Sequence, residues 1–283
     1  MTSIAAPAQA ERRPLRTVFA FIRRHVLTVY SLLFFAYLLL PIAVVVVFSF
    51  NHPAGKFNYT WQGFTLDNWR HWDAVPGIRS AIVLSLEIAL IASFVATALG
   101  TLIALALVRY GFRGRGATNI LIFLPLSTPE IVLGASLLTL FLNVTWLPLG
   151  FWTILIAHVM FCISFAVVTV KARLVGFDRH LEEAAMDLGA NEWVTFQKVT
   201  LPLIAPAILA ALLLCFAISI DDFVVTYFNS GASVTFPLFV WGAARIAVPP
   251  QVNVIGTAIF VVAATLMLGN VILQRVRTAK GAV

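Results

Sequence analysis

Charge is scarce in this sequence. Only 11% of its 283 residues are charged, whereas 61% are hydrophobic. A soluble globular domain has about 25% charged and 45–50% apolar residues, so an ordinary soluble domain is excluded and an integral membrane protein is indicated. The net charge of +7 does not point to nucleic acid, because the basic residues stand at the ends of apolar runs, as membrane topology requires.

Cysteine and the common catalytic signatures are also lacking. The two cysteines, Cys162 and Cys215, lie inside apolar runs, so we expect small buried side chains rather than a disulfide or a metal site. No GxxxxGK[ST], HExxH or GxSxG string occurs, and the five histidines are scattered. We therefore expect a chain that is not an enzyme, carries no cofactor and binds no ATP through a P-loop of its own.

Long apolar runs are what the chain does contain. They predict a membrane domain over residues 26–275, between an N-terminal tail, 1–25, and a C-terminal tail, 276–283. We expect six transmembrane helices in it, at about 26–50, 78–108, 118–143, 149–173, 205–228 and 253–274. The first run is too long for a signal-peptide core and lacks a cleavage site, so it is interpreted as an uncleaved span. The predicted fold class is all-α integral membrane.

One segment, residues 176–204, is charged and amphipathic instead of apolar. Its apolar positions recur at helical spacing and form a stripe: Leu181, Ala184, Ala185 and Leu188. The acidic residues take the other side: Glu182, Glu183 and Asp187. Gly189 is expected to end this helix in a left-handed cap, Asn191 to cap a second short helix, and Leu201-Pro202 to stop that one. We call residues 181–202 the elbow.

The basic residues also predict how the chain is oriented in the membrane. With the N-terminus in the cytoplasm, all but four of the 19 lysine and arginine residues fall in cytoplasmic segments. The four that fall outside are Lys56, Arg70, Arg79 and Arg245. Cytoplasmic loops carry an excess of positive charge, so both termini and the elbow are predicted to lie in the cytoplasm.

The elbow carries a specific resemblance. The pattern Glu183-Ala184-Ala185, Gly189 after three residues and Val199-x-Leu201-Pro202 after nine more resembles the EAA loop of type I (MetI-like) ABC-importer permease subunits. That family has isoleucine where this chain has Val199, which is a conservative departure. The resemblance implies docking of the elbow on a cytoplasmic ABC ATPase dimer through Glu183, Ala184, Ala185, Asp187, Gly189, Leu201 and Pro202. It also implies a bacterial inner membrane, a periplasmic solute-binding protein and a second permease subunit, either a homologue or a second copy.

Four acidic residues lie inside the predicted spans: Glu87, Glu130, Asp221 and Asp222. A charge in hydrocarbon costs from about 3 to over 10 kcal/mol, so such residues usually face a cavity or a partner. With a rise of about 1.5 Å per residue, all four fall between the midplane and the outer face. We therefore predict that they line a pathway for a cationic solute.

Each acid also has a structural interpretation. Thr128 can cap a helix that begins at Pro129, with Glu130 favoured there by the helix dipole, and this is compatible with a pathway role. Pro125 and Pro129 favour a broken helix. Asp221 and Asp222 lie about 100° apart around a helix, so one is expected to line the pathway while the other caps or pairs. For Glu87 an interhelical hydrogen bond is an equal alternative.

Two further segments, Pro125–Gly134 and Ser219–Phe223, resemble parts of spermidine/putrescine-type permease subunits. A polyamine carries ammonium groups on an apolar stem, so carboxylates beside Phe223, Tyr227 and Trp241 would suit it through ion pairs and cation–π contacts. The resemblance thus implies polyamine uptake. Three alternatives stay open. One is an ABC permease for another solute, such as an iron complex, an amino-acid derivative or an oxyanion, and a second is a proton-coupled transporter in which Glu130 and Asp221 carry protons. The third, a membrane scaffold that transports nothing, is disfavoured by the cost of four acids inside the membrane.

Overall fold

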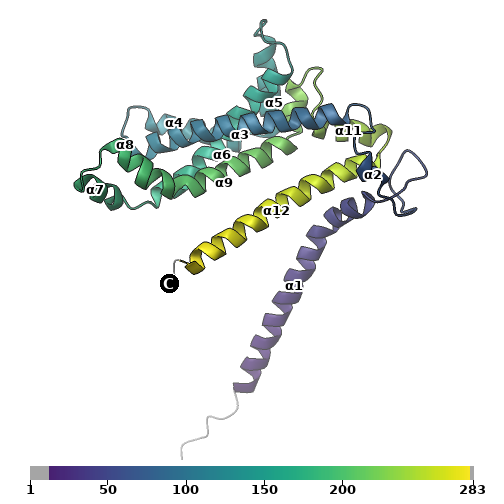
Figure 1. Cartoon of the computed structure of the whole chain (residues 1–283), viewed down its shortest axis with the longest axis horizontal. Coiled ribbons are helices and arrows are strands. Elements are labelled where there is room, and N and C mark those ends of the chain that lie inside the picture. The colour runs from purple at the N-terminus through teal and green to yellow at the C-terminus, as the bar shows by residue number, and fades with distance from the viewer. Residues whose placement is uncertain (1–12, 281–283) are drawn as a thin grey trace, which may run out of the picture. The chain divides into compact units, whose positions relative to one another are not determined.

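The structure, a computed structural model, describes residues 13–280 (Figure 1). This part of the chain is helical, with helices α1 to α12 and one π-helical segment, η1. It separates into two compact units, described below one at a time. The first contains residues up to 74 and from 247 onward, and the second runs from Val75 to Ile246.

The first unit contains α1 (Arg13–Phe48), α2 (Asp67–Arg70) and α12 (Pro250–Lys280). The turn-rich segment after α1 is built around the buried Asn51. The Asn51 amide donates to Asn58 Oδ1 at 2.6 Å, and its Oδ1 accepts from the backbone of Gln62 at 2.8 Å. A backbone bridge between Phe57 and Val248 joins this segment to the residues before α12.

The second unit has a core of three long helices, α3 (Ile78–Arg109), α6 (Phe151–Val175) and α9 (Leu201–Asp221), which run alongside one another (Figure 1). Small residues make this possible, since they let helix backbones approach closely. A Cβ atom added at Gly100 of α3 would lie only 2.5 Å from the Cβ of Ala166 in α6. The α3–α6 contact therefore requires glycine at this position.

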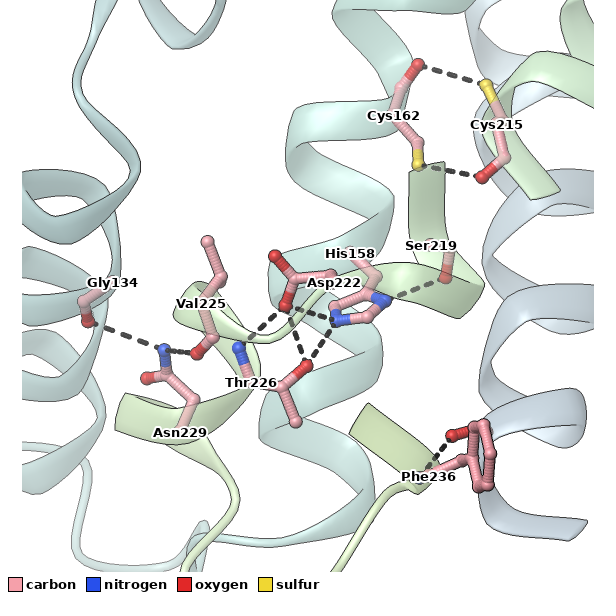
Figure 2. Close-up of polar contacts among 11 residues, drawn as sticks. Gly134, His158, Cys162, Cys215, Ser219, Asp222, Val225, Thr226, Asn229 and Phe236 are labelled. Atoms are coloured by element: carbon pink, nitrogen blue, oxygen red, sulfur yellow. Dashed lines mark hydrogen bonds and ion pairs between the residues drawn. The ribbon is translucent and has the colours of Figure 1, made fainter. Parts of the chain in front are cut away.

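The two cysteines lie in the same core. Cys162 and Cys215 are completely buried, and each thiol faces the backbone carbonyl of the other residue, at 3.6 and 3.3 Å (Figure 2). Both are free thiols. The prediction of two small buried side chains is confirmed.

The third predicted span is a broken helix, as its prolines indicated. Helices α4 (Arg115–Ser127) and α5 (Glu130–Leu142) meet at 110°. The prediction that Thr128 caps the second helix is wrong, because its hydroxyl donates to the carbonyl of Leu124 at 2.7 Å and closes α4 instead. Thr128 is extended, as the residue before a proline usually is, and this turns the chain.

The fifth predicted span has different bounds from those expected, about 205–228. Helix α8 (Glu192–Thr195), η1 (Phe196–Thr200) and α9 form one continuous helix that ends at Asp221, and the short α10 (Val224–Asn229) follows. Pro202 therefore does not stop the helix. The wide π turn ahead of it changes the backbone register where the proline ring would otherwise meet the carbonyl four residues earlier.

The all-α membrane class is confirmed, whereas the count of six spans stays a prediction. Among the described residues, four helices are long and apolar enough to cross a membrane, or five if the bent α4–α5 pair is one span. The sixth predicted span falls on α12, of which Pro250–Thr265 qualifies as a shorter apolar helix. Another, α11 (Phe236–Ile246), lies between the fifth and sixth predicted spans.

Candidate functional site

A cavity of about 390 Å³ lies in the second unit, where the broken helix α4–α5 faces the junction of α9 and α10. Three of the four predicted pathway acids line it: Glu130, Asp221 and Asp222. Aromatic rings form part of its wall, from Phe161, Phe165 and Phe223. The cavity thus combines carboxylates with apolar surface. Glu87 does not line it, and lies exposed on α3.

Asp222 is the acid that caps and pairs. One of its carboxylate oxygens accepts from the backbone N–H of Thr226 at 2.8 Å and from its hydroxyl at 2.7 Å (Figure 2). The same oxygen lies 3.4 Å from Nε2 of His158, and the Asp222 side chain is 8% exposed. The carboxylate satisfies donors at the start of α10, which explains why α9 stops and a new helix begins here.

His158 of α6 holds this junction together, although it belongs to no recognised sequence motif. Its Nδ1 lies 2.7 Å from the Ser219 hydroxyl and its Nε2 lies 2.9 Å from the Thr226 hydroxyl (Figure 2). Because the Thr226 hydroxyl donates to Asp222, it must accept from Nε2–H, and in a neutral ring Nδ1 accepts from Ser219. A polar residue in the middle of an apolar run was the available signal.

Asp221 and Glu130 have different surroundings from Asp222. Both side chains are exposed, and neither forms an ion pair within the part of the chain that the structure describes. Glu130 begins α5, on the far side of the bend from α4, and Asp221 is the last residue of α9. Two unpaired carboxylates from different helices therefore line the same cavity.

The three aromatic residues named in the sequence analysis lie together beside the cavity. The ring of Phe223 lies 5.6 Å from that of Tyr227 and 5.2 Å from that of Trp241, between centroids. The guanidinium group of Arg245 stacks on Trp241, 4.6 Å from the ring centroid. Phe223 lines the cavity, whereas a face of Trp241 is already occupied by a cation of this chain.

The elbow has the predicted construction from its first helix to the cap of its second, and differs only where the second helix continues through Pro202. Helix α7 (His180–Asp187) is followed by Gly189 at a φ of 90°, and Asn191 Oδ1 accepts from the backbone of Val194 at 2.9 Å. The apolar stripe is uncovered, with Leu181 49% and Leu188 91% exposed. Trp193 of α8, 64% exposed, extends the apolar surface. The elbow therefore presents apolar side chains that nothing in the second unit covers.

Glu182 corrects the prediction that all three acids of α7 face away. It is buried, both of its oxygens accept from the Arg109 guanidinium, and the Thr200 hydroxyl donates to it as well. Burial alone would raise the pKa of Glu182, but the hydrogen bonds from Arg109 and Thr200 lower the pKa below its usual value. The ionised Glu182 therefore stabilises the folded protein fully at a pH above the usual carboxyl pKa. This stabilisation is lost as the pH falls through the lowered pKa of Glu182.

Comparison with known proteins identifies the family. Residues 96–279 match the family described as binding-protein-dependent transport system inner membrane components. The chain belongs to this family. The spermidine/putrescine transport system permease protein PotC of Escherichia coli K12 is 38% identical to this permease over 245 residues, which are 86% of this chain and 92% of PotC.

A further relative supports this assignment, and a solved structure shows the same fold. The putrescine transport system permease protein PotI of the same strain is 39% identical to this permease over 235 residues, covering 81% of this chain and 83% of PotI. A crystal structure of a bacterial ABC transporter involved in the import of alginate contains a chain of the same fold. It covers 93% of this permease and 99% of its own length, with a TM-score of 0.66 at 16% identity. The permease is therefore a multi-pass inner-membrane protein of the ABC-importer fold.

Proposed function

We propose that this permease is one of two permease subunits of an ATP-driven importer that moves polyamines into the cytoplasm. A periplasmic binding protein delivers the solute, and a homologous second permease completes the pathway. A separate cytoplasmic ATPase dimer hydrolyses ATP. Both termini and the elbow lie on the cytoplasmic side.

The cavity carries the polyamine part of this proposal. The unpaired carboxylates of Glu130 and Asp221 can each pair with an ammonium group, and the ring of Phe223 offers an apolar face that also attracts cations. An oxyanion would meet like charge here. The names of PotC and PotI, both permeases of polyamine systems, support the same solute class.

The elbow carries the ATPase part. The exposed stripe with Ala184 at its centre allows a partner to approach closely, as in a helix that lies in a groove. ATP can drive transport only if it binds one conformation of the complex better than the other. We assign the transmission of that preference to the elbow, which would move with the spans as a rigid body.

Uptake in proteoliposomes tests the solute and the energy source. The full complex should accumulate radiolabelled putrescine or spermidine in an ATP-dependent manner that uncouplers do not affect. An iron complex, a neutral amino-acid derivative and sulfate, offered with the same binding protein, should not be taken up. Uptake without the ATPase and sensitive to uncouplers would instead identify a proton-coupled transporter.

Two substitutions test the docking role of the elbow. Proline at Gly189 cannot adopt its φ of 90°, and Ala185→Arg places a bulky charge within the apolar stripe. Each should abolish uptake and ATPase coupling while leaving membrane insertion intact. Ala172→Arg, at an exposed position on α6 outside the elbow, serves as the control. Normal uptake by either elbow variant would count against docking there.

A further inference from the structure

The ion pair between Glu182 and Arg109 joins elements that are far apart in the sequence. Arg109 is the last residue of α3, Glu182 lies in the first turn of α7, and Thr200 ends η1. The side chains of Glu182 and Arg109 are 8% and 23% exposed. A two-pronged arginine–carboxylate contact fixes orientation as well as distance. Three elements are therefore held at one buried point.

A second contact fastens the same two regions. Arg179, just before α7, donates to the backbone carbonyl of Val108 at 3.0 Å. This carbonyl belongs to the last turn of α3, where carbonyls lack helical partners. The Arg109 guanidinium also lies 5.7 Å from the centroid of the Phe177 ring. Polar contacts thus attach the start of α7 to the end of α3.

The rest of α7 has little else to hold it. Its apolar stripe is exposed, and Gly176 and Gly189 flank the segment that contains it. Helix α3, in contrast, is packed closely against α6 along the core, as the contact at Gly100 shows. A force on α7 reaches α3 directly through Glu182, whereas without this contact α7 could turn about its flanking residues.

We propose that Glu182 is a positioning residue that fastens the elbow to α3, so that a displacement imposed by the ATPase moves α3 instead of bending the elbow. The inference rests on the proposed function, because it requires a partner that moves the elbow. Removing one member of a buried pair leaves the other charge unpaired, so the neutral variant loosens the attachment. Glu182 itself acts through Arg109 and touches no solute.

The test compares coupling with assembly in the complete transporter. In proteoliposomes, Glu182→Gln and Arg109→Gln are compared with the control Arg113→Gln. Arg113 lies in the turn that follows α3, is exposed, and forms no ion pair among the described residues. The measured quantities are putrescine molecules imported per ATP hydrolysed and ATPase subunit retained on purification. In Glu182→Gln and Arg109→Gln, the number of putrescine molecules imported per ATP should fall about tenfold, which is a typical size for the coupling between two sites. Both variants should retain the ATPase subunit as the unmodified complex does. Arg113→Gln should leave both measured quantities unchanged.

A charge swap distinguishes the pair from its individual members. Arg109→Glu combined with Glu182→Arg should restore the ratio to within about threefold of the unmodified complex, because coupled residues show non-additive effects. A swap with no restoration would overturn the proposal, as would a normal ratio in Glu182→Gln. Loss of ATPase subunit in proportion to transport would also overturn it, because Glu182 would then belong to the docking surface.

A milder variant keeps the proposal testable if Glu182→Gln fails to insert. Thr200→Val removes one hydrogen bond to Glu182 and keeps the ion pair. The ratio should fall about threefold, as expected for one net hydrogen bond, and an unchanged ratio would overturn the proposal. If the unmodified complex neither retains the ATPase nor imports putrescine, the proposed function itself fails. That result differs from the failure of the Glu182 proposal, which is seen only in the variants.

Discussion

Asp221 and Asp222 are neighbours in the sequence with different surroundings. Asp222 is tied to Thr226 and His158 at the start of α10, while Asp221 ends α9 and lines the cavity without an ion pair to any described residue. The helix break separates the two carboxylates. Their substitution should therefore affect different measurements.

We expect Asp221→Asn to raise the KM of polyamine uptake about tenfold, as the loss of one charge-assisted contact of about 1.5 kcal/mol would. The amount and thermal stability of the protein should be unchanged. Asp222→Ala should instead cost about 1 kcal/mol of stability, as the loss of a helix cap does. Uptake kinetics and thermal unfolding of the detergent-purified permease measure the two effects. The opposite pattern would reverse the roles assigned to the two residues.

His158 offers a sharper test of the junction. His158→Ala leaves the hydroxyls of Ser219 and Thr226 without their buried partner and should cost about 1–3 kcal/mol. Thermal unfolding in detergent should show a lower Tm. His52→Ala, at an exposed position in the first unit, is the matched control and should leave the Tm unchanged. Equal Tm values for both variants would mean that the network does not hold the junction.

At the scale of elements, the helices and helix breaks that the sequence predicted correctly depend on local signals. The two helices of the elbow and the α4–α5 break follow from glycine, asparagine and proline at particular positions, because these residues restrict or cap the backbone where they stand. Hydrophobic run lengths likewise predicted the long helices. These features need no knowledge of distant contacts.

The contacts and the helix end that the sequence did not predict depend on residues far apart in the chain. Glu182 meets Arg109 across 73 positions, and His158 meets Ser219 and Thr226 across 61 and 68. On a helical wheel Glu182 is one of three acids on a polar side, and nothing local distinguishes it from Glu183. The end of α9 was missed for a related reason: the apolar run continues past Asp222, and the capping contacts decide the boundary.

The close approach of α3 and α6 gives a prediction for a whole helix pair. Gly100→Val would place atoms where the Cβ position is already 2.5 Å from Ala166 and 3.1 Å from the backbone nitrogen of Val167. The helices must separate, which should cost about 1–3 kcal/mol or more and lower the Tm in detergent. Gly116→Val in α4, where a Cβ meets nothing within 4 Å, is the control. A small effect at Gly100 equal to that of the control would contradict the packing.

At the scale of the molecule, the second unit separates its two candidate sites. Helices α7 and α8 lie at one end of the core helices, and α5 and α11 lie toward the other (Figure 1). The placement of the elbow in the cytoplasm and of the acids nearer the outer face, predicted from the sequence, requires such a separation. Arg109 lies at the elbow end, because it contacts Glu182. The turn that follows α3 must therefore share the membrane side of the elbow.

Cysteine labelling can determine that side. The native cysteines are completely buried and should not react, so one introduced cysteine reports alone. Arg113→Cys, in the turn after α3, should react with a membrane-impermeant maleimide only after spheroplasts are permeabilised, whereas Lys56→Cys, at an exposed position after α1, should react in intact ones. The reverse pattern would place the elbow outside, where no ATPase can reach it. Because the turn and the elbow share the Arg109–Glu182 contact, labelling at Arg113 decides the orientation of the elbow without touching its docking surface.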